Sequence, residues 1–572
     1  MRNWRLYILV FFVILVGFTL VFRLFSLQIL KYDFYKGLAA NQRETYKILF
    51  PKRGEIFIKD RFYDEGLSNE LFPLAVDRDW PMIYAIPKEI EDKEAAIKSL
   101  LPLLEIDEEI LREKINKKND PYEPLKHKVS SEVADKIKEL EIKGIELISE
   151  GWRYYPADSL VSQVIGFVGF SGDEKTGQYG IERYYNKELE GECGFLDGEK
   201  DTQGRLIAIA KHYLQPAKDG VDLILTIDSN IQFFIEEKIK EITNYLNAEG
   251  GTIIVMDPQT GAIKGLANWP TFDLNKYSEV ESIDVFLNPA IHGLFEPGSI
   301  FKPITMAIAL DKKLLNPDTT YEDKGFIKIE NTLIHNSHDK PEGIQTMSQV
   351  LEKSLNTGAV FVQQLIGKKI FKDYLEKFGF SKKTGIDLVG EIKGNLSNLN
   401  TKRDIEYATA SFGQGIAITP MELATALSSI ANGGKLMRPY VVEKFIYSDG
   451  REEIVMPEIV GQAISSETAD KLTKMLIDVV ENGYGKKAGV SGYFVAGKTG
   501  TAQVPDNDSG GYSPDKTIHS FGGFFPAFNP KFLILIKLDN PQKIRFAADS
   551  VTPVFSEIAK YILNYYEIAP TR

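Results

Sequence analysis

Cysteine and histidine are the scarcest reactive residues of this 572-residue sequence. Cys193 is the single cysteine, which excludes an internal disulfide and a cysteine-ligated zinc or iron–sulfur cluster. Among the six histidines, His335 and His338 form an H-x-x-H pair, but they stand in a polar stretch without a third ligand nearby. We therefore expect neither a metal nor a cofactor.

A surplus of basic residues is also missing. Lys and Arg number 68 against 80 Asp and Glu, a net charge of −12, and no block of basic residues occurs. Such a chain is a poor nucleic-acid binder, so no nucleic-acid partner is expected. Hydrophobic residues are plentiful at 43%, which excludes wholesale disorder, and the length requires two or three domains.

The sequence does contain one long uncharged apolar run, LYILVFFVILVGFTLVF, at residues 6–22. A helix of that length is roughly 26 Å long, just enough to cross the hydrocarbon layer of a membrane. Large residues follow it in place of a small-residue cleavage site, which favours an uncleaved signal anchor over a removable signal peptide. We expect a cytoplasmic tail at 1–5, a single transmembrane anchor at 6–23, and the bulk of the chain outside the cytoplasm.

The pattern of the remaining chain changes at Gly220. Residues 24–219 mix short β-like runs with charged helical segments and gather no chemistry. Beyond them, strand pairs and helices alternate without βαβ regularity, which predicts an α+β fold with an antiparallel sheet covered by helices. Gly413-Gln-Gly415 lacks the further glycine of G-x-G-x-x-G, so it predicts no phosphate cradle.

The most informative segment is Phe295-Glu-Pro-Gly-Ser299-Ile-Phe-Lys302-Pro. It predicts Ser299 at the N-terminus of an apolar helix, with Lys302 on the same face. A serine hydroxyl needs a base to become nucleophilic, and a lysine serves only if apolar surroundings or a nearby cation keep it neutral. The helix N-terminus would stabilise an oxyanion developing beside the serine.

Two further motifs follow, and context separates them from copies elsewhere in the chain. Ser354-Leu-Asn356 is the single S-x-N sequence. Lys498-Thr-Gly leads into Thr501-Ala-Gln-Val, which predicts a strand with Gly500 open to close approach by a ligand. The other S-x-x-K and K-T-G sequences lie in polar turns, where solvated side chains are expected; they begin at Ser337, Ser513, Lys175 and Lys383.

Taken in order, S-x-x-K, S-x-N and K-T-G are the signature of the penicilloyl-serine transferases. The stretches FEPGSIFKP, LEKSLNTGAV, FGQGIAITPMELATALSSIANGG and VAGKTGTAQ resemble a class B penicillin-binding protein. Upstream, WRYYPADSLVSQVIGFVG and YGIERYYNKELEG are similar to the pedestal domain of that family. The resemblance implies a mixed α/β pedestal (dimerisation-type) domain at 24–219 and an α+β transpeptidase domain at 220–572.

The resemblance also implies a role for each motif. Ser299 attacks the penultimate D-Ala carbonyl of a peptidoglycan stem peptide, expels the terminal D-Ala, and forms an acyl-enzyme that an amine then attacks to give a cross-link. Lys302 takes the serine proton, Ser354 relays a proton to the departing amine, and Asn356 orients Lys302 and the substrate amide. The third motif, formed by Lys498, Thr499, Gly500 and Thr501, holds the substrate carboxylate. The backbone N–H groups of Ser299 and Thr501 form the oxyanion hole.

The same resemblance implies the partners and the place of action. The expected ligands are peptidoglycan stem peptides, with β-lactam antibiotics as covalent inhibitors. A polytopic membrane glycan polymerase and other division or elongation proteins are the expected protein partners. The protein is expected in the bacterial cytoplasmic membrane as a single-pass protein, with its catalytic domain on the extracytoplasmic side.

Two alternatives share these motifs. A β-lactamase or β-lactam sensor would carry the same three sequences, but a free lactamase needs only one domain and a sensor needs more than the short segment before the anchor. The rate of deacylation of Ser299 discriminates between them. The second alternative is a catalytically weak envelope scaffold, against which the three intact motifs argue.

Overall fold

The computed structural model describes residues 17–19, 44–49, 51–64, 66–67, 70–117, 120, 122–171, 174–199, 213–337, 340–505 and 511–572. The chain forms two compact units: Met1–Gly54 with Lys187–Val221, and Glu55–Asn186 with Asp222–Arg572. These units are grouped by contacts along discontinuous segments. They do not test the predicted boundary between the domains 24–219 and 220–572, which stays a prediction. The predicted tail at 1–5 lies outside the described residues, as does the anchor at 6–23 apart from 17–19.

The first unit contains a three-stranded antiparallel sheet. Strand β8 (Gly194–Glu199) lies in its centre, between β1 (Glu44–Leu49) and β9 (Tyr213–Gln215). Residues 17–19 are helical. Across the described ranges, no helix is both long enough and apolar enough to span a membrane.

The second unit contains two large sheets, and the first of them has mixed strand directions. Its order is β19-β18-β10-β2-β3-β4, with β5 also paired to β3, and β10 runs parallel to β2. Helices α4, α5 and α6 pack on β3 and β5 through a core of apolar side chains that includes Ile83, Leu100 and Leu111. The bounds are β2 Ile56–Lys59, β3 Phe72–Ala85, β4 Glu123–Lys126, β5 Ile145–Tyr154, β10 Asp222–Asp228, β18 Val442–Ile446, β19 Glu452–Ile454, α4 Lys93–Leu104, α5 Glu108–Asn116 and α6 Ser131–Glu139.

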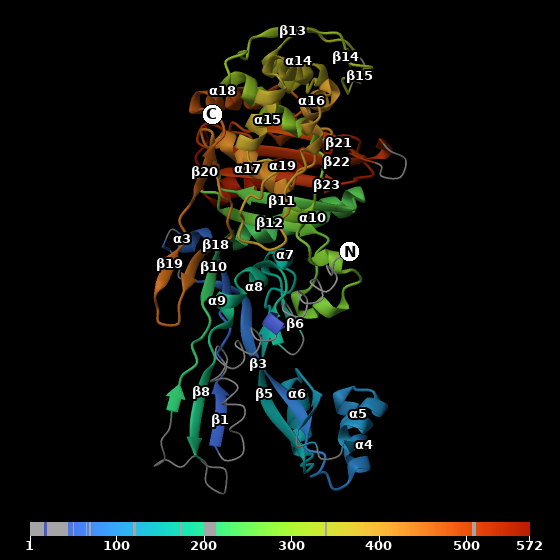
Figure 1. Cartoon of the computed structure of the whole chain (residues 1–572), viewed down its shortest axis with the longest axis vertical. Helices are drawn as coiled ribbons and strands as arrows, with labels where there is room; N and C mark the ends of the chain where they lie inside the picture. Colours follow the sequence, from blue (N-terminus) through green and yellow to red (C-terminus); the bar gives the residue numbers. More distant parts are fainter. Residues whose placement is uncertain are drawn as a thin grey trace, which may run out of the picture. The chain divides into compact units, whose positions relative to one another are not determined.

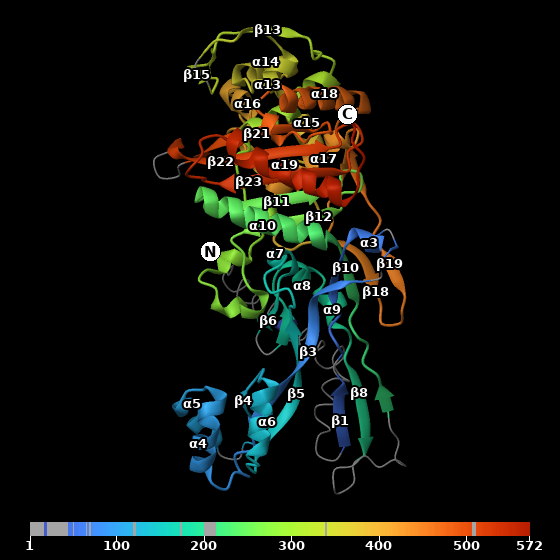
Figure 2. The same ribbon diagram turned by 180° about the vertical axis from the view of Figure 1, so that it is seen from behind.

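The second large sheet is antiparallel throughout, with strand order β12-β11-β23-β22-β21 (Figure 1). Helices α10 and α19 cover one of its faces (Figure 2), and α17 packs against the other. The predicted antiparallel sheet covered by helices is confirmed. Its bounds are β11 Gly250–Met256, β12 Ile263–Trp269, β21 Ala496–Pro505, β22 Tyr512–Phe525, β23 Phe532–Asp539, α10 Ser229–Leu246, α17 Pro420–Ala431 and α19 Ala547–Tyr565.

Burial explains the apolar composition of this sheet. The strand β23, FLILIKLD, is apolar on both faces because helices cover both. On the α10 and α19 side, Ile235, Phe521 and Phe555 are fully buried in one core cluster. Only β21 and β12 are edge strands, so β21 has one side free to approach another segment.

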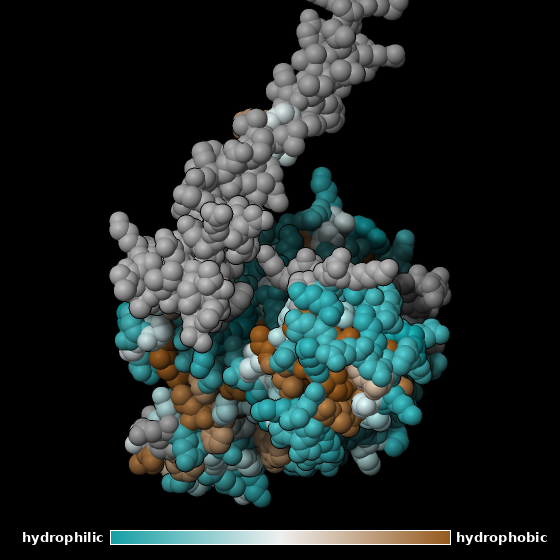
Figure 3. All heavy atoms as spheres, turned by 90° about the horizontal axis from the view of Figure 1, so that it is seen from below, coloured by the Kyte–Doolittle hydropathy of each residue, from teal (hydrophilic) through white to brown (hydrophobic). Residues whose placement is uncertain are grey.

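A group of helices and short hairpins completes the second unit above β21. Helix α12 (Lys302–Asp311) packs on α14 (Asn356–Ile366) and on α18 (Ser466–Glu481), and α18 packs on β21. The remaining elements of the described chain are α3 Arg61–Asp64, α7 Ser162–Ile165, α8 Gly180–Tyr184, α11 Pro289–His292, α13 Met347–Glu352, α15 Lys368–Lys377, α16 Asp404–Ala410, β6 Val168–Ser171, β7 Glu174–Gly177, β13 Thr320–Asp323, β14 Phe326–Ile329, β15 Thr332–His335, β16 Gly343–Thr346, β17 Lys435–Met437 and β20 Ile459–Gln462, with α9 Asn186–Glu190 lying mostly in the first unit. Seen from below, the coloured surface is mainly hydrophilic with separate hydrophobic areas (Figure 3).

Candidate active site

The predicted nucleophile lies in a tight turn just before a helix. Ser299 belongs to a 3-10 turn, Gly298–Phe301, and Lys302 is the first residue of α12. The helix therefore begins three residues later than the sequence predicts. Gly298 makes the turn possible because its φ is +62°, a backbone conformation that L side chains rarely adopt. Ser299 is half-buried, whereas Lys302 is almost fully buried.

The amine of Lys302 reaches the second motif. Its Nζ donates to the carbonyl oxygen of Ser354 at 2.5 Å and to the Oγ of Ser354 at 3.2 Å. Burial, and then repulsion from the Lys498 cation, lower the pKa of Lys302 well below its ordinary value. The shift favours the neutral amine, the form that can accept a proton from serine.

The third motif brings a second buried amine to the same hydroxyl. Lys498 Nζ donates to the Oγ of Ser354 at 3.0 Å and to the carbonyl oxygen of Thr499 at 3.2 Å. Its side chain is almost fully buried, and burial lowers the pKa of Lys498 to about 7. Ser354 thus stands between two lysines whose ammonium forms are both destabilised by loss of water.

Two predicted contacts are not formed in the described structure. No hydrogen bond joins the side chains of Ser299 and Lys302 among the residues described, since Lys302 is engaged with Ser354. Asn356 does not hydrogen-bond Lys302 either; its Nδ2 donates to the carbonyl oxygen of His335 at 2.9 Å. Asn356 therefore ties the second motif to β15. Hydrogen bonds of catalytic groups often close only when substrate is present.

Strand β21 lies directly beside the serine turn. A Cβ on Gly500 would stand 2.9 Å from the carbonyl oxygen of Pro297 and 2.5 Å from Ser520 Oγ, so only glycine permits this approach. Gly500 is predicted to admit close approach of a ligand, and in the structure its lack of a side chain also lets β21 pack against the serine turn. Thr501, the residue after Gly500, also makes a fixed contact. Its Oγ1 accepts a hydrogen bond from the N–H of Ala547 at 3.1 Å. That bond fixes the start of α19 against β21.

An open cleft of about 850 Å³ runs past these motifs. Asn356 of the second motif and Thr501 of the third line it, together with β15 on one wall and residues 541–546 on another. Its volume is in the upper part of the range of ligand-binding clefts, about 300–1,000 Å³. A second cavity of about 430 Å³, lined by Lys383 and Glu422, contains none of the predicted catalytic residues.

One loop that holds the serine turn was not predicted from the sequence. The N–H of Gly298 donates to the carbonyl oxygen of Gly413 at 3.0 Å, and a Cβ on Gly413 would lie 2.3 Å from the carbonyl oxygen of Gly298. Glu296 also joins this loop, because its Oε1 accepts from the N–H of Gly415 at 3.0 Å. Its Oε2 accepts from the hydroxyl of Tyr512 at 2.9 Å. The glycine pair in FGQG was the available signal, and it serves backbone packing.

A buried polar cluster supports the second motif. The Oγ1 of Thr357 donates to Asp323 Oδ1 at 2.6 Å, and the N–H of Thr357 donates to Asn336 Oδ1 at 3.2 Å. Asn336 in turn donates to both carboxylate oxygens of Asp323. These bonds fix the first turn of α14, where Asn356 stands.

Among the residues that begin the duplicated motifs, Ser337 lines the cleft, whereas Ser513, Lys175 and Lys383 do not. Ser513 Oγ accepts from the N–H of Lys516 in a local turn. Lys175, expected to be solvated, lies 3.8 Å from the ring centroid of Trp152, a cation–π contact that the sequence does not predict. Lys383 is exposed, as expected.

A serine at a helix start, two buried lysines meeting on a second serine, and a five-stranded antiparallel sheet between helices together define a penicilloyl-serine transferase. The family model of the penicillin binding protein transpeptidase domain matches residues 251–560, and that of the penicillin-binding protein dimerisation domain matches residues 49–225. The chain belongs to the penicillin-binding protein transpeptidase family.

Individual relatives agree with the family. The chain is 32% identical over 529 residues to stage V sporulation protein D of Bacillus subtilis (strain 168), covering 91% of this chain and 79% of that protein. It is 30% identical over 559 residues to the probable peptidoglycan D,D-transpeptidase PenA of Neisseria meningitidis serogroup B, covering 97% of this chain and 91% of that protein. The crystal structure of penicillin binding protein 3 from Mycobacterium tuberculosis, complexed with aztreonam, has the same fold, with a TM-score of 0.70, 24% identity, and coverage of 92% and 98%.

Proposed function

We propose that this protein is a peptidoglycan D,D-transpeptidase, a serine acyl-transferase that cross-links stem peptides ending in D-Ala-D-Ala and is inhibited covalently by β-lactams. The observation that carries this function is the convergence of Lys302 and Lys498 on Ser354 beside the Ser299 turn. Such a site can deprotonate a serine and bind a carboxylate within one small volume. Membership of the family supplies the substrate class.

The acylation step follows from the two amines. Neutral Lys302 accepts the proton of Ser299 as the hydroxyl attacks the penultimate D-Ala carbonyl. The N–H groups of Ser299 and Thr501 receive the developing oxyanion, next to the start of α12. Protonated Lys498, with Thr499 and Thr501, binds the terminal carboxylate of the donor.

The departing D-Ala needs a proton on its amine. Ser354 is the relay, because its hydroxyl touches Lys302 on one side and Lys498 on the other. The proton taken from Ser299 passes from Lys302 through this hydroxyl to the leaving nitrogen. The acceptor amine then attacks the acyl-enzyme, loses a proton along the reverse route, and leaves as the cross-linked peptide.

The location and partners are part of the proposal. The apolar run 6–22 anchors the protein in the cytoplasmic membrane, with the transpeptidase domain 220–572 and the pedestal 24–219 on the extracytoplasmic side. A membrane glycan polymerase would supply the glycan strands. Protease added outside intact spheroplasts should degrade all of the chain beyond about residue 30; full protection of the catalytic region would overturn this orientation.

Labelling with fluorescent penicillin tests the activity. The full-length protein in detergent should acquire one acyl group, and peptide mapping should place it on Ser299. Ser299→Ala should abolish labelling while thermal melting stays unchanged, since Ser299 is half-buried and small. Slow deacylation is expected of a transpeptidase, and rapid turnover of penicillin would identify a β-lactamase instead.

A further inference from the structure

The cleft contains a positive charge that the three motifs do not use. Arg545 and Lys543 lie on the loop between β23 and α19, and both line the cleft, as Thr501 does. Neither forms an ion pair with any residue in the described part of the chain. Asp515 is the acidic residue among those lining the cleft, and within the same ranges it too has no ion pair, so it does not neutralise Arg545.

The backbone around Arg545 is fixed at both ends. At its C-terminal end, the N–H of Ala547 donates to Thr501 Oγ1 at 3.1 Å. At its N-terminal end, the N–H of Gln542 donates to the carbonyl oxygen of Leu246 at 2.9 Å. Arg545 is therefore held two residues from a contact with the K-T-G strand, which is a preorganised position for a binding residue.

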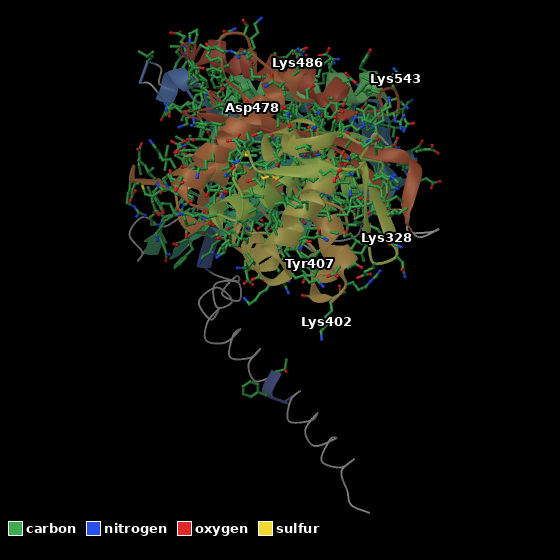
Figure 4. All side chains as sticks on the ribbon, turned by 90° about the horizontal axis from the view of Figure 1, so that it is seen from above. Lys328, Lys402, Tyr407, Asp478, Lys486 and Lys543 are labelled. Atoms are coloured by element: carbon green, nitrogen blue, oxygen red, sulfur yellow. The ribbon has the colours of Figure 1, made fainter. Side chains whose placement is uncertain are left out.

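Of the two cations, the guanidinium of Arg545 is better placed than the ammonium of Lys543 to bind a ligand in the cleft. The guanidinium lies 5.2 Å from the ring centroid of Phe546, which also lines the cleft, so the ring restrains it there. The ammonium of Lys543 instead lies 5.3 Å from the ring of Tyr245 on α10, which does not line the cleft. Figure 4, seen from above, shows Lys543 at the periphery of the domain. A planar guanidinium matches a carboxylate with two parallel hydrogen bonds.

We propose that Arg545 forms a second carboxylate subsite, which binds a free carboxylate of the substrate other than that of the terminal D-Ala. The inference rests on the proposed function and adds a substrate feature to it. That carboxylate is either on a side chain of the donor peptide or on a side chain of the acceptor. The chemistry is the same in both cases, and two experimental arms distinguish the sources.

The donor arm uses two β-lactams that differ in one group. Carbenicillin is benzylpenicillin with a carboxylate added to its side chain. The ratio of their second-order acylation rate constants should fall about tenfold in Arg545→Gln, the scale of one charge-assisted hydrogen bond. A ratio is measured because it cancels any general effect of the variant on Ser299.

The acceptor arm uses transfer from a pentapeptide that ends in D-Ala-D-Ala. The ratio of product formed with D-glutamate to product formed with D-glutamine should fall about tenfold in Arg545→Gln if an acceptor side chain supplies the carboxylate. In either arm, Arg545→Lys should keep part of the preference because the charge remains. Raising the salt concentration should reduce the preference of the unmodified protein, as it would not for a packing effect.

Lys516→Gln is the matched control. Lys516 is an exposed cation on β22 that pairs with Glu249 and does not line the cleft, so neither ratio should change. A fall in one ratio identifies the donor or the acceptor as the source. If neither ratio changes in Arg545→Gln while benzylpenicillin still acylates Ser299, the subsite is wrong and the transpeptidase function stands. If benzylpenicillin fails to acylate the unmodified protein, the function itself is wrong.

Discussion

Gly298 and Gly413 meet backbone to backbone, with the N–H of Gly298 donating to the carbonyl oxygen of Gly413 at 3.0 Å. Both have a positive φ, +62° and +81°. The contact fixes the turn that carries Ser299 to the loop before α17. The position of the nucleophile therefore depends on a residue more than a hundred positions away in the sequence.

Gly413→Ala should damage catalysis more than stability. Its Cβ would lie 2.3 Å from the carbonyl oxygen of Gly298, so the serine turn must move, and a shift of about 1 Å at a reacting group costs about 100-fold in rate. The left-handed backbone adds about 1–2 kcal/mol of destabilisation. Penicillin acylation and thermal melting measure the two effects.

Gly390→Ala is the control for this prediction. Gly390 has a φ of +85° but no atom within 4 Å of its Cβ position, so the substitution brings the same backbone strain without the collision. It should lower the melting temperature and leave acylation unchanged. Equal acylation rates in the two variants would show that the Gly298 contact does not position the nucleophile.

Replacing Lys302 or Lys498 by arginine should lower the acylation rate to different extents. Lys302→Arg keeps a charge but removes a group that can accept a proton, so acylation should fall by at least about 100-fold. Lys498→Arg keeps a cation for the carboxylate and should retain more activity. Second-order acylation by benzylpenicillin measures both. Near-normal acylation in Lys302→Arg would leave Ser354, activated by Lys498, as the better base.

The acylation rate should depend on pH through both amines. Burial lowers the pKa of Lys498 to about 7, so its carboxylate-binding cation is lost as the pH rises through that value. Burial and Lys498 lower the pKa of Lys302, so its neutral form is lost as the pH falls. We expect a bell-shaped profile of the second-order rate constant.

Lys498→Arg supplies the control for the pH profile. Arginine stays protonated throughout this range, so the alkaline limb near pH 7 should disappear in the variant and the acidic limb should remain. An alkaline limb that is unchanged in Lys498→Arg would assign it to another group, and the role of Lys498 in carboxylate binding would need revision.

Substitutions in the duplicated motifs should not affect penicillin labelling. Ser513→Ala, Ser337→Ala and Lys383→Ala should each leave penicillin labelling of folded protein intact. Ser513 makes a local turn bond, and Lys383 lines a separate cavity. Gel fluorescence after labelling measures this, and loss of labelling in any one variant would show that the wrong copy was chosen.

The sequence predicts the parts of this site that depend on local order. Three motifs in sequence, the apolar helix after Lys302 and the strand after Lys498 identify the fold class and the residues. The predicted helix start and the first α-helical residue differ by one 3-10 turn, which is a frequent feature of helix ends. The predicted Asn356–Lys302 contact is absent from the described structure because Asn356 bonds His335, a residue the motif does not contain.

The contacts missed by sequence reasoning are those between distant segments. Nothing near Glu296 in the sequence indicates that it accepts hydrogen bonds from Gly415 and Tyr512. Likewise, Lys175 gives no local sign of its ring contact with Trp152. Such pairings are decided by tertiary packing, which a single sequence does not display.

The pKa of Lys498 also makes ligand binding a proton-uptake reaction. Near neutral pH a fraction of the free molecules lacks the Lys498 proton, whereas a bound carboxylate stabilises the charged form. Binding therefore draws a fraction of a proton from the buffer. The heat of binding measured by calorimetry will then vary with the ionisation enthalpy of the buffer, even when the affinity does not.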